Sequence, residues 1–450
     1  MIHDAHGWWL AEAGGVEPAP ALEGDVTADV VVIGGGYAGL WTAWQLLERG
    51  ASVAVLEADV CGHGPSGRNG GFCETLWSNF PDLVERFGRS RALAAAQASS
   101  ESVAAIGAWC EAQGVDAWFK RRGFLFASTA EPQDRVVDEI LGSGAPPDKV
   151  VALDSAALRA RCDSPRFRRG VLVPDDATVH PARLALGLRA RVIERGARVF
   201  ERSRVRALRG TVAETAHGRV RAGAAVLTVN AAARGVKPLR HRLAVTSSHI
   251  VLTEPVPDAL ERLGWTGGES ITDARTFLHY FRTTDDHRIV FGWGGGRLAA
   301  GARLNGRVEV DPAVAAETRR HLFELLPATE GARITHAWGG PIDVSPSHLP
   351  QVGTLDKMHF AFGFTGNGVG PCHLAGRILA ARAAGETPDV ELPEADTVPV
   401  PGEPLAWAGG MLVRAAFLRR ERLESEGRRA DPLTRAVTAA PRALGIHVGR

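Results

Sequence analysis

The clearest pattern of apolar and polar positions lies near the start of the chain. A β-branched run, Val30 to Ile33, leads into a glycine cluster. An apolar-periodic stretch from Tyr37 to Leu47 follows, and then a second β-branched run from Ser52 to Leu56. Short apolar runs on either side of a helical periodicity predict a strand, a tight turn, a helix and a second strand.

The glycines of this turn have the spacing of a dinucleotide-binding motif. Gly34, Gly36 and Gly39 form G-x-G-x-x-G, and Glu57 ends the second strand 18 residues later. Such glycines permit the turn, the approach of a pyrophosphate and close packing of helix on strand, and the acid binds ribose hydroxyls. An acid there argues against a 2′-phosphate, hence against NADP. The alternative is an ordinary βα turn, but strand, helix, second strand and acid all agree.

A glycine-rich segment, Cys61 to Phe72, comes directly after this unit. It reads CGHGPSGRNGGF and contains five glycines and a proline, which predicts neither a regular helix nor a strand. Its position suits a loop running along the cofactor, with Ser66 and Arg68 reaching phosphate. The alternative is a flexible surface loop, and His63 is interpreted as an ordinary loop histidine.

A second stretch with the same pattern lies near the other end, at 359–381. An apolar strand is followed by Gly363, Gly366, Gly368 and Gly370 and then by an apolar helix. Glycines leave backbone N–H groups unobstructed at a helix start, where the helix dipole stabilises negative charge. The alternative is a purely structural strand-turn-helix.

The remaining pattern predicts a sheet, several helices and a tail. Strand signals crowd 243–292, and together with much of 72–170 they predict a mostly antiparallel sheet. Trp8, Trp9 and Leu10 are expected to pack on the body. An amphipathic helix is expected within 404–427, docked on its own body or on a partner subunit; a membrane surface is the weaker alternative.

Composition narrows the function classes. The 450 residues carry a formal net charge of +1, which gives no push toward nucleic acid. Five scattered cysteines without a C-x-x-C pair favour a reducing compartment and argue against a redox disulfide or a zinc site, so no metal is predicted. No signal peptide and no apolar run of membrane-spanning length is found, which predicts a cytoplasmic protein. The lack of a G-x-S-x-G elbow excludes a hydrolase of that type.

Five motifs occur together in one order: the first glycine turn with Glu57, S-G-R-N-G-G, H-P-A-R-L, W-G-G followed by P-x-x-G, and G-F-x-G-x-G-V. This set resembles the FAD-dependent amine and amino-acid oxidoreductases of the D-amino-acid oxidase superfamily, over roughly residues 25 to 385. Within it, the S-G-R-N-G-G loop looks most like the γ-glutamylputrescine oxidase branch, relatives of glycine and sarcosine oxidases.

The resemblance implies noncovalent FAD, since no confident counterpart of a flavin-linking cysteine is found. It implies pyrophosphate, ribose and adenine contacts in the first half of the chain and flavin-ring contacts in the second. Asn367 stands where the family usually has His or a comparable residue. The implied cofactor residues are Gly34, Gly36, Tyr37, Ala38, Gly39, Glu57, Ala58, Ser66, Arg68, Asn69, Gly70, Gly71, Val205, Asn230, Gly363, Gly366, Asn367, Gly368 and Val369.

The implied fold is α/β (α+β overall), a Rossmann-like FAD-binding domain interleaved with a mostly antiparallel substrate domain. The expected division is a lead-in at 1–28, a discontinuous FAD-binding domain at 29–80, 171–240 and 335–385, a substrate domain at 81–170 and 241–334, and a helical tail at 386–450.

The implied reaction is oxidation of the C–N bond of a small primary or secondary amine or amino acid, with hydride passing to flavin N5 and the imine then hydrolysed. Candidates for the substrate site are His249, Tyr280 and Trp338, with ordinary sheet packing an equal alternative. The electron acceptor is molecular oxygen or another acceptor, with an oxidase favoured over a dehydrogenase. A hydroxy-acid oxidase, a flavin dehydrogenase and a non-catalytic FAD-binding subunit stay open as alternatives, as does a homo-oligomer.

Overall fold

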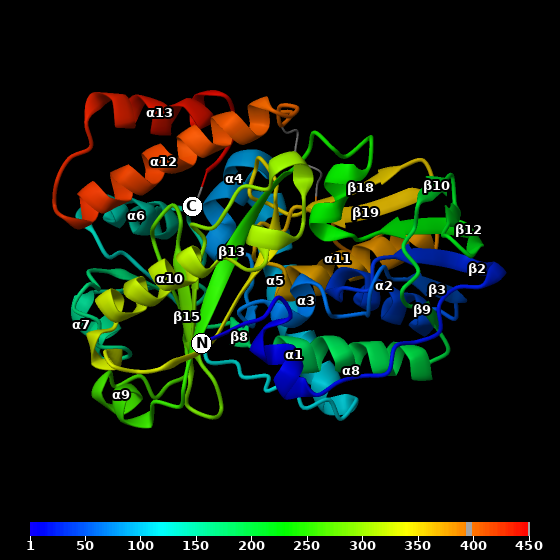
Figure 1. Cartoon of the computed structure of the whole chain (residues 1–450), viewed down its shortest axis with the longest axis horizontal. Coiled ribbons are helices and arrows are strands. Elements are labelled where there is room, and N and C mark those ends of the chain that lie inside the picture. The colour runs from blue at the N-terminus through cyan, green and yellow to red at the C-terminus, as the bar shows by residue number, and fades with distance from the viewer. Residues whose placement is uncertain (393–397, 449–450) are drawn as a thin grey trace.

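Two β-sheets with their helices lie side by side along the long axis of the molecule (Figure 1). The computed structural model describes residues 1–392 and 398–448. One sheet has eight strands and the other nine. This two-sheet arrangement confirms the predicted α/β class, with a Rossmann-like unit beside a mostly antiparallel sheet.

The eight-stranded sheet is built on parallel strands. Its members are β10 (Ala207–Arg209), β11 (Val212–Glu214), β12 (Gly218–Leu227), β2 (Gly24–Ile33), β3 (Val53–Leu56), β9 (Arg198–Phe200), β19 (Met358–Phe362) and β18 (Gln351–Leu355). Ile33 lies opposite Leu56 and Leu227, and Leu227 lies opposite Phe360. Because β2, β3, β12 and β19 run parallel, the loops that leave their carboxyl ends meet at one edge of the sheet.

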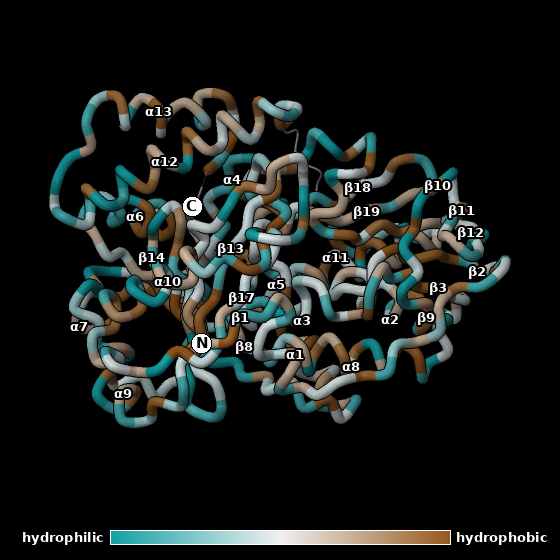
Figure 2. The backbone as a smooth tube through the Cα atoms, in the orientation of Figure 1, coloured by the Kyte–Doolittle hydropathy of each residue, from teal (hydrophilic) through white to brown (hydrophobic). Residues whose placement is uncertain are grey.

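Helices on and around this sheet contribute to the largest hydrophobic cluster. They are α2 (Tyr37–Glu48), α4 (Phe80–Phe87), α5 (Arg89–Ala112), α8 (Pro181–Glu194) and α11 (Val369–Ala383). Trp41 and Trp44 of α2 meet Trp109 of α5 edge to face. The hydropathy colouring shows apolar backbone gathered in these inner elements and polar residues in the outer loops (Figure 2). Burial of these large aromatic faces fixes α2 and α11, whose N-termini border the site.

The nine-stranded sheet is mostly antiparallel, with parallel pairs only at β1–β17 and β14–β5 among the pairings of the described residues. In order its strands are β1 (Ile2–His3), β17 (Ile334–Val344), β13 (Ala244–Thr253), β16 (Ile289–Trp293), β15 (His279–Thr283), β14 (Ser270–Asp273), β5 (Phe124–Ala127), β7 (Gly170–Val173) and β6 (Val151–Leu153). Its outer helices are α6 (Asp134–Gly142), α7 (Ser155–Arg159), α9 (Pro257–Arg262) and α10 (Pro312–Leu325). Two short strands, β4 (Phe72–Cys73) and β8 (Ala177–Thr178), form a separate antiparallel pair.

The two sheets alternate along the chain more often than the domain boundaries expected from the sequence. Strands β7 and β17 belong to the nine-stranded sheet, although both fall in segments that the sequence assigns to the FAD-binding domain. Helix α5 packs on α11 of the other unit. An apolar strand or helix does not reveal its partner by its own pattern. The domain boundaries expected from the sequence therefore stay a prediction.

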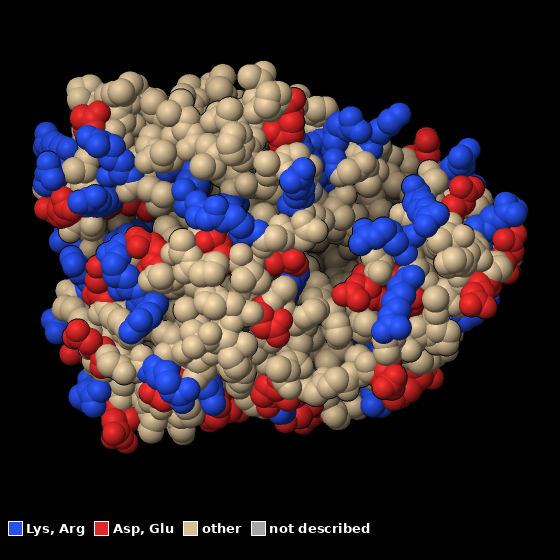
Figure 3. Space-filling model, in the orientation of Figure 1, with Lys and Arg blue, Asp and Glu red and all other residues tan. Residues whose placement is uncertain are grey.

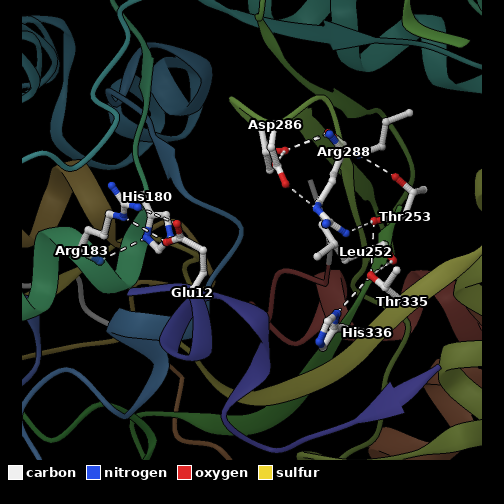
Figure 4. A network of polar contacts seen from close by, with 11 residues as sticks. Glu12, His180, Arg183, Leu252, Thr253, Asp286, Arg288, Thr335 and His336 are labelled. Atoms are coloured by element: carbon white, nitrogen blue, oxygen red, sulfur yellow. Dashed lines mark hydrogen bonds and ion pairs between the residues drawn. The ribbon is translucent and has the colours of Figure 1, made fainter. Parts of the chain in front are cut away.

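The lead-in is firmly attached to the body, which confirms that its aromatic residues are buried. Trp8, Trp9 and Leu10 of α1 (Gly7–Ala13) lie in one hydrophobic cluster. Glu12 accepts a 3.0 Å hydrogen bond from Arg183, and its second contact is to His180, 2.6 Å from Nε2 (Figure 4). In the same view Arg288 donates to the Thr253 carbonyl and to Asp286, bracing the neighbouring sheet.

The tail forms two helices, α12 (Leu405–Ser425) and α13 (Pro432–Ala443), at the top of Figure 1. Residues 393–397 and 449–450 of the expected tail lie outside the described residues. Arg414 donates to the Gly296 carbonyl over 2.7 Å, and Phe417 meets Phe277 edge to face. The amphipathic helix thus docks on its own body, one of the two dockings expected from the sequence. In the described part of the chain, no helix is long and apolar enough to cross a membrane.

Candidate functional site

The first glycine turn lies at the carboxyl end of β2 and has no room for side chains. Gly34 has φ of 107°, and a Cβ there would lie 2.4 Å from the Thr228 carbonyl oxygen. A Cβ on Gly39 would lie 1.9 Å from the Gly34 carbonyl oxygen, so α2 packs against the turn only because residue 39 is glycine. A Cβ on Gly36 would lie 2.9 Å from Ser66 Oγ. The turn therefore has the backbone shape that the sequence motif predicts.

Glu57 lies beside this turn at the end of β3. Its two carboxylate oxygens accept hydrogen bonds from the N–H groups of Gly35 (2.7 Å) and Asp59 (2.9 Å). Burial raises the pKa of Glu57, and these N–H groups oppose that rise. The Ser203 N–H donates to the Glu57 carbonyl over 2.7 Å, which brings the half-buried Val205 close to the same strand end. The structure thus gathers the residues predicted for ribose and adenine, and their roles stay a prediction.

The loop after β3 contains a regular turn, which corrects the prediction that it has no helix or strand. Pro65–Arg68 form one helical turn, α3, and Phe72–Cys73 form β4. The reason is local: the fixed φ of Pro65 suits the first helical position after Gly64. Ser66 Oγ accepts a 2.9 Å bond from the Tyr37 N–H, so the turn is tied to the start of α2.

The polar side chains of this loop hold the loop itself. Asn69 Nδ2 donates to the carbonyl oxygens of Pro65 and Ser66, and its Oδ1 accepts from the Gly71 N–H. Arg68, expected to reach phosphate, instead donates to the Ala5 carbonyl and pairs with Glu309 at 3.1 Å. Glu309 balances the charge of Arg68, whose buried Nε has no hydrogen-bond partner among the described residues. Its phosphate contact stays a prediction.

The second glycine turn stands at the same sheet edge, before α11. Gly363 and Gly366 have φ of 73° and 87°. Asp343, at the end of β17, accepts the Gly363 N–H over 2.5 Å, and burial raises its pKa to about 7. Sequence reasoning missed Asp343, whose only signal is one acid at the end of a largely apolar strand. This carboxyl group joins the two sheets at the edge where α11 begins.

Asn367 is the polar group of this turn that the protein leaves unsatisfied. Its Nδ2 and Oδ1 are both buried, and neither finds a hydrogen-bond partner among the described residues. Buried amides are normally satisfied, so an orphaned carboxamide next to a helix N-terminus indicates a missing polar ligand. A flavin ring, with its carbonyl and N–H groups, fits this requirement.

One cavity of about 1330 Å³ reaches the start of α2 and the second glycine turn, while Gly34, Gly36 and Glu57 of the first turn are not among the residues that line it. Its lining includes Tyr37 and Ser66 from the first unit and the run Gly366, Asn367, Gly368 and Val369 from the second. The space-filling view shows the surface hollowed where α11 lies in Figure 1 (Figure 3). A cofactor in this cavity would therefore meet the second glycine turn and the start of α2.

The opposite wall of the cavity comes from the nine-stranded sheet. Tyr280 on β15 and Trp338 on β17, two of the predicted substrate-site residues, line it together with Ser248 and Ile250 of β13. Ser248 Oγ lies 2.8 Å from the Tyr280 hydroxyl and donates to the Trp293 carbonyl. Burial raises the pKa of Tyr280 to about 12, so its phenol is neutral at neutral pH.

His249 does not take the place expected of it. It points to the other face of β13, where its ring packs against Gly339 and its Nε2 lies 3.2 Å from Ser247 Oγ. Successive strand residues alternate between faces, so Ser248 and Ile250 face the cavity and His249 does not. Burial lowers the pKa of His249 to about 4, which leaves it neutral. His249 is therefore not among the residues that line this cavity, unlike Tyr280 and Trp338.

A surface group of three side chains has the composition of a metal site. His6, Asp59 and His63 place one ligand atom each within 4.8 Å of one another, and His6 and Asp59 are exposed. The Asp4 carboxylate accepts the backbone N–H of His6. This group gathers at the end of β3 outside the cavity wall described above.

Comparison with known proteins extends these observations. The sequence matches the family described as FAD dependent oxidoreductase over residues 29–382. Gamma-glutamylputrescine oxidoreductase of Escherichia coli (strain K12) is 30% identical over 401 residues, which cover 86% of this chain and 90% of the relative. Probable oxidoreductase OrdL of Rhizobium meliloti (strain 1021) is 27% identical over 433 residues, covering 93% and 96%. The glycine oxidase structure from Geobacillus kaustophilus shares the fold with a TM-score of 0.66 and 20% identity, over 82% of this chain and 97% of that chain.

Proposed function

The chain belongs to the FAD-dependent oxidoreductase family, and from that premise we propose that it oxidises the C–N bond of a primary or secondary amine or amino acid. The predicted dependence on FAD is confirmed by family membership. The observation that carries the proposal is the cavity that joins the start of α2 and the glycine turn before α11 to a wall with Tyr280 and Trp338. The relative named for an amine substrate, gamma-glutamylputrescine, supports the choice of amines.

Several groups suit the two halves of FAD. The first turn, with Gly34, Gly36 and Glu57, would hold the pyrophosphate and ribose. Asn367 and the start of α11 would hold the flavin ring, whose chemistry when bound is to accept a hydride from the carbon next to nitrogen. Burial raises the pKa of the cavity thiol Cys372, which disfavours the thiolate that a covalent link requires. We therefore propose noncovalent FAD.

The protein's own contribution to the reaction is to orient the substrate amine and to disfavour its protonated form. Ser248 donates its one hydroxyl hydrogen to the Trp293 carbonyl, so the Tyr280 hydroxyl must be the donor in its bond with Ser248. The lone pairs of the Tyr280 oxygen then stay free to accept a hydrogen bond. A substrate N–H can bind there. The walls of Ile250, Trp338 and Tyr280 disfavour an ammonium ion and so favour the unprotonated amine that is oxidised. A strong base is not required of these residues, and the neutral Tyr280 is consistent with that.

An anaerobic flavin-reduction screen tests the proposal. The purified, FAD-loaded protein is mixed without oxygen with polyamines, γ-glutamyl amines, N-methyl amino acids, D-amino acids and hydroxy acids. Bleaching of the flavin absorbance by amines and not by hydroxy acids is the expected result. Bleaching by hydroxy acids alone, or by none of the panel, would overturn it. Readmitting oxygen then tests the proposed oxidase activity, since an oxidase releases hydrogen peroxide and a dehydrogenase needs an added dye.

A further inference from the structure

The tail supplies a wall of the cavity although it lies outside the family match. The match ends at residue 382, and α12 begins at Leu405. The cavity lining includes Trp407, Arg414, Phe417, Arg420, Glu421 and Glu424 of α12. A segment beyond the matched residues thus contributes to the shape of this end of the cavity.

Glu421 is the buried acid of that wall. It is 5% exposed and lines the same cavity as Tyr280 and Asn367. Its Oε1 accepts the Phe277 N–H over 2.9 Å. Burial raises the pKa of Glu421 to about 7, against the opposing effect of the nearby Arg275. The Glu421 carboxyl group therefore lies in a wall of the cavity where burial disfavours its ionised form.

Once Glu421 is ionised, one negative charge around it is in excess: the acids are Asp273, Glu421 and Glu424, the cations are Arg275 and Arg420, and burial lowers the pKa of His279, which lies 2.6 Å from Asp273. Arg275 lies with its Nε 3.5 Å from Asp273, a fully buried carboxylate, and so is shared between two acids. Glu424, one turn further along α12, is already neutralised by Arg420 at 2.6 Å. A buried charge without full compensation is costly, and a cation from the ligand would provide that compensation.

We propose that Glu421 is a distal ammonium-binding subsite, and that the substrate is an amine with a second cationic amino group. The second group would pair with Glu421 while the first meets the flavin end. Phe277 and Phe417 line the cavity beside Glu421 and offer apolar surface to a methylene chain. This inference rests on the proposed amine oxidation and adds the class of amine.

The test compares α,ω-diamines with n-alkylamines of the same length on the FAD-loaded enzyme. Glu421→Gln keeps an oxygen that accepts the Phe277 N–H and removes only the charge. Glu424→Gln removes an equal charge from the same helix at a position that Arg420 already neutralises, and serves as the matched control. We expect wild type to prefer diamines. E421Q should raise the diamine KM roughly ten- to hundredfold, the cost of losing a charge-assisted bond, with kcat and the monoamine KM little changed.

The outcomes separate this inference from the proposed function. Equal KM values for diamines and monoamines in wild type, or equal losses in E421Q and E424Q, would overturn the subsite while leaving amine oxidation intact. Thermal melting of each variant shows whether it is folded. If no amine reduces the flavin, the proposed function fails, and calorimetric titration with a diamine still decides the subsite. Diamine binding that E421Q abolishes and E424Q keeps supports it, and any other pattern overturns it.

Discussion

The indole N–H of Trp338 donates a hydrogen bond of 2.7 Å to the carbonyl oxygen of Arg68. Trp338 lies on β17 of the nine-stranded sheet and is 2% exposed, and Arg68 ends the helical turn of the loop beside the first glycine turn. Both residues line the cavity. This buried polar contact therefore fixes the substrate wall against the cofactor loop, across the junction between the two units.

Trp338→Phe is expected to lower the free energy of unfolding and to weaken FAD binding. It removes the donor to a buried carbonyl, which costs about 1–3 kcal/mol beyond the loss of ring packing. Trp293→Phe is the matched control, because the buried Trp293 Nε1 has no hydrogen-bond partner among the described residues. Urea unfolding and flavin-fluorescence titration give both quantities. Equal losses in the two variants would show that the bond to Arg68 contributes nothing.

Gly39→Ala is expected to prevent FAD binding, because the added Cβ would lie 1.9 Å from the Gly34 carbonyl oxygen. Overpacking of this kind costs about 1–3 kcal/mol even where neighbours can shift, and backbone cannot shift easily here. Gly64→Ala is the control, since a Cβ at Gly64 meets nothing within 4 Å. The absorbance ratio of flavin to protein after purification is the measurement. A fully loaded G39A would contradict the close approach of helix and turn.

Local spacing made the first glycine turn predictable, whereas the contacts that site residues make with distant parts of the chain could not be predicted from the sequence. Gly34, Gly36 and Gly39 act within one turn, so their spacing alone carries the prediction. The partner of Arg68 is Glu309, which lies 241 residues away, and no local pattern connects them. The fully buried run of β13 shows no alternation, so nothing in the sequence tells whether His249 or Ser248 faces the cavity.

Asp343 should make stability depend on pH in the apoprotein. Its folded pKa of about 7 exceeds the ordinary 3.8, so the folded state binds a proton that the unfolded state releases between these values. Stability from this group is therefore present at low pH and is lost as the pH rises to about 7, with a slope of about 1.4 kcal/mol per pH unit at most. Asp343→Asn removes this dependence.

The measurement is the difference in unfolding free energy between wild type and D343N from about pH 4.5 to about pH 8, where contributions of all other groups cancel. We expect wild type to lose about 3 kcal/mol relative to D343N over that range, less than the full shift implies because the unfolded carboxyl group is already partly ionised at about pH 4.5. Parallel curves for the two proteins would show that Asp343 titrates normally.

Asn367→Ala is expected to leave the stability of the apoprotein unchanged or raise it, and to weaken the binding of FAD. In the apoprotein both polar atoms of Asn367 are buried without a partner among the described residues, so their removal costs little or raises the melting temperature. In the holoprotein the same atoms would bind the flavin, and their loss should weaken FAD binding roughly tenfold, the worth of about one hydrogen bond. Asn69→Ala is the control, since its amide is satisfied by Pro65, Ser66 and Gly71 and its loss should destabilise the apoprotein. Melting curves with and without FAD, together with a flavin titration, distinguish the two. If N367A destabilises the apoprotein as much as N69A does, or binds FAD as tightly as wild type, the Asn367 carboxamide does not bind the flavin.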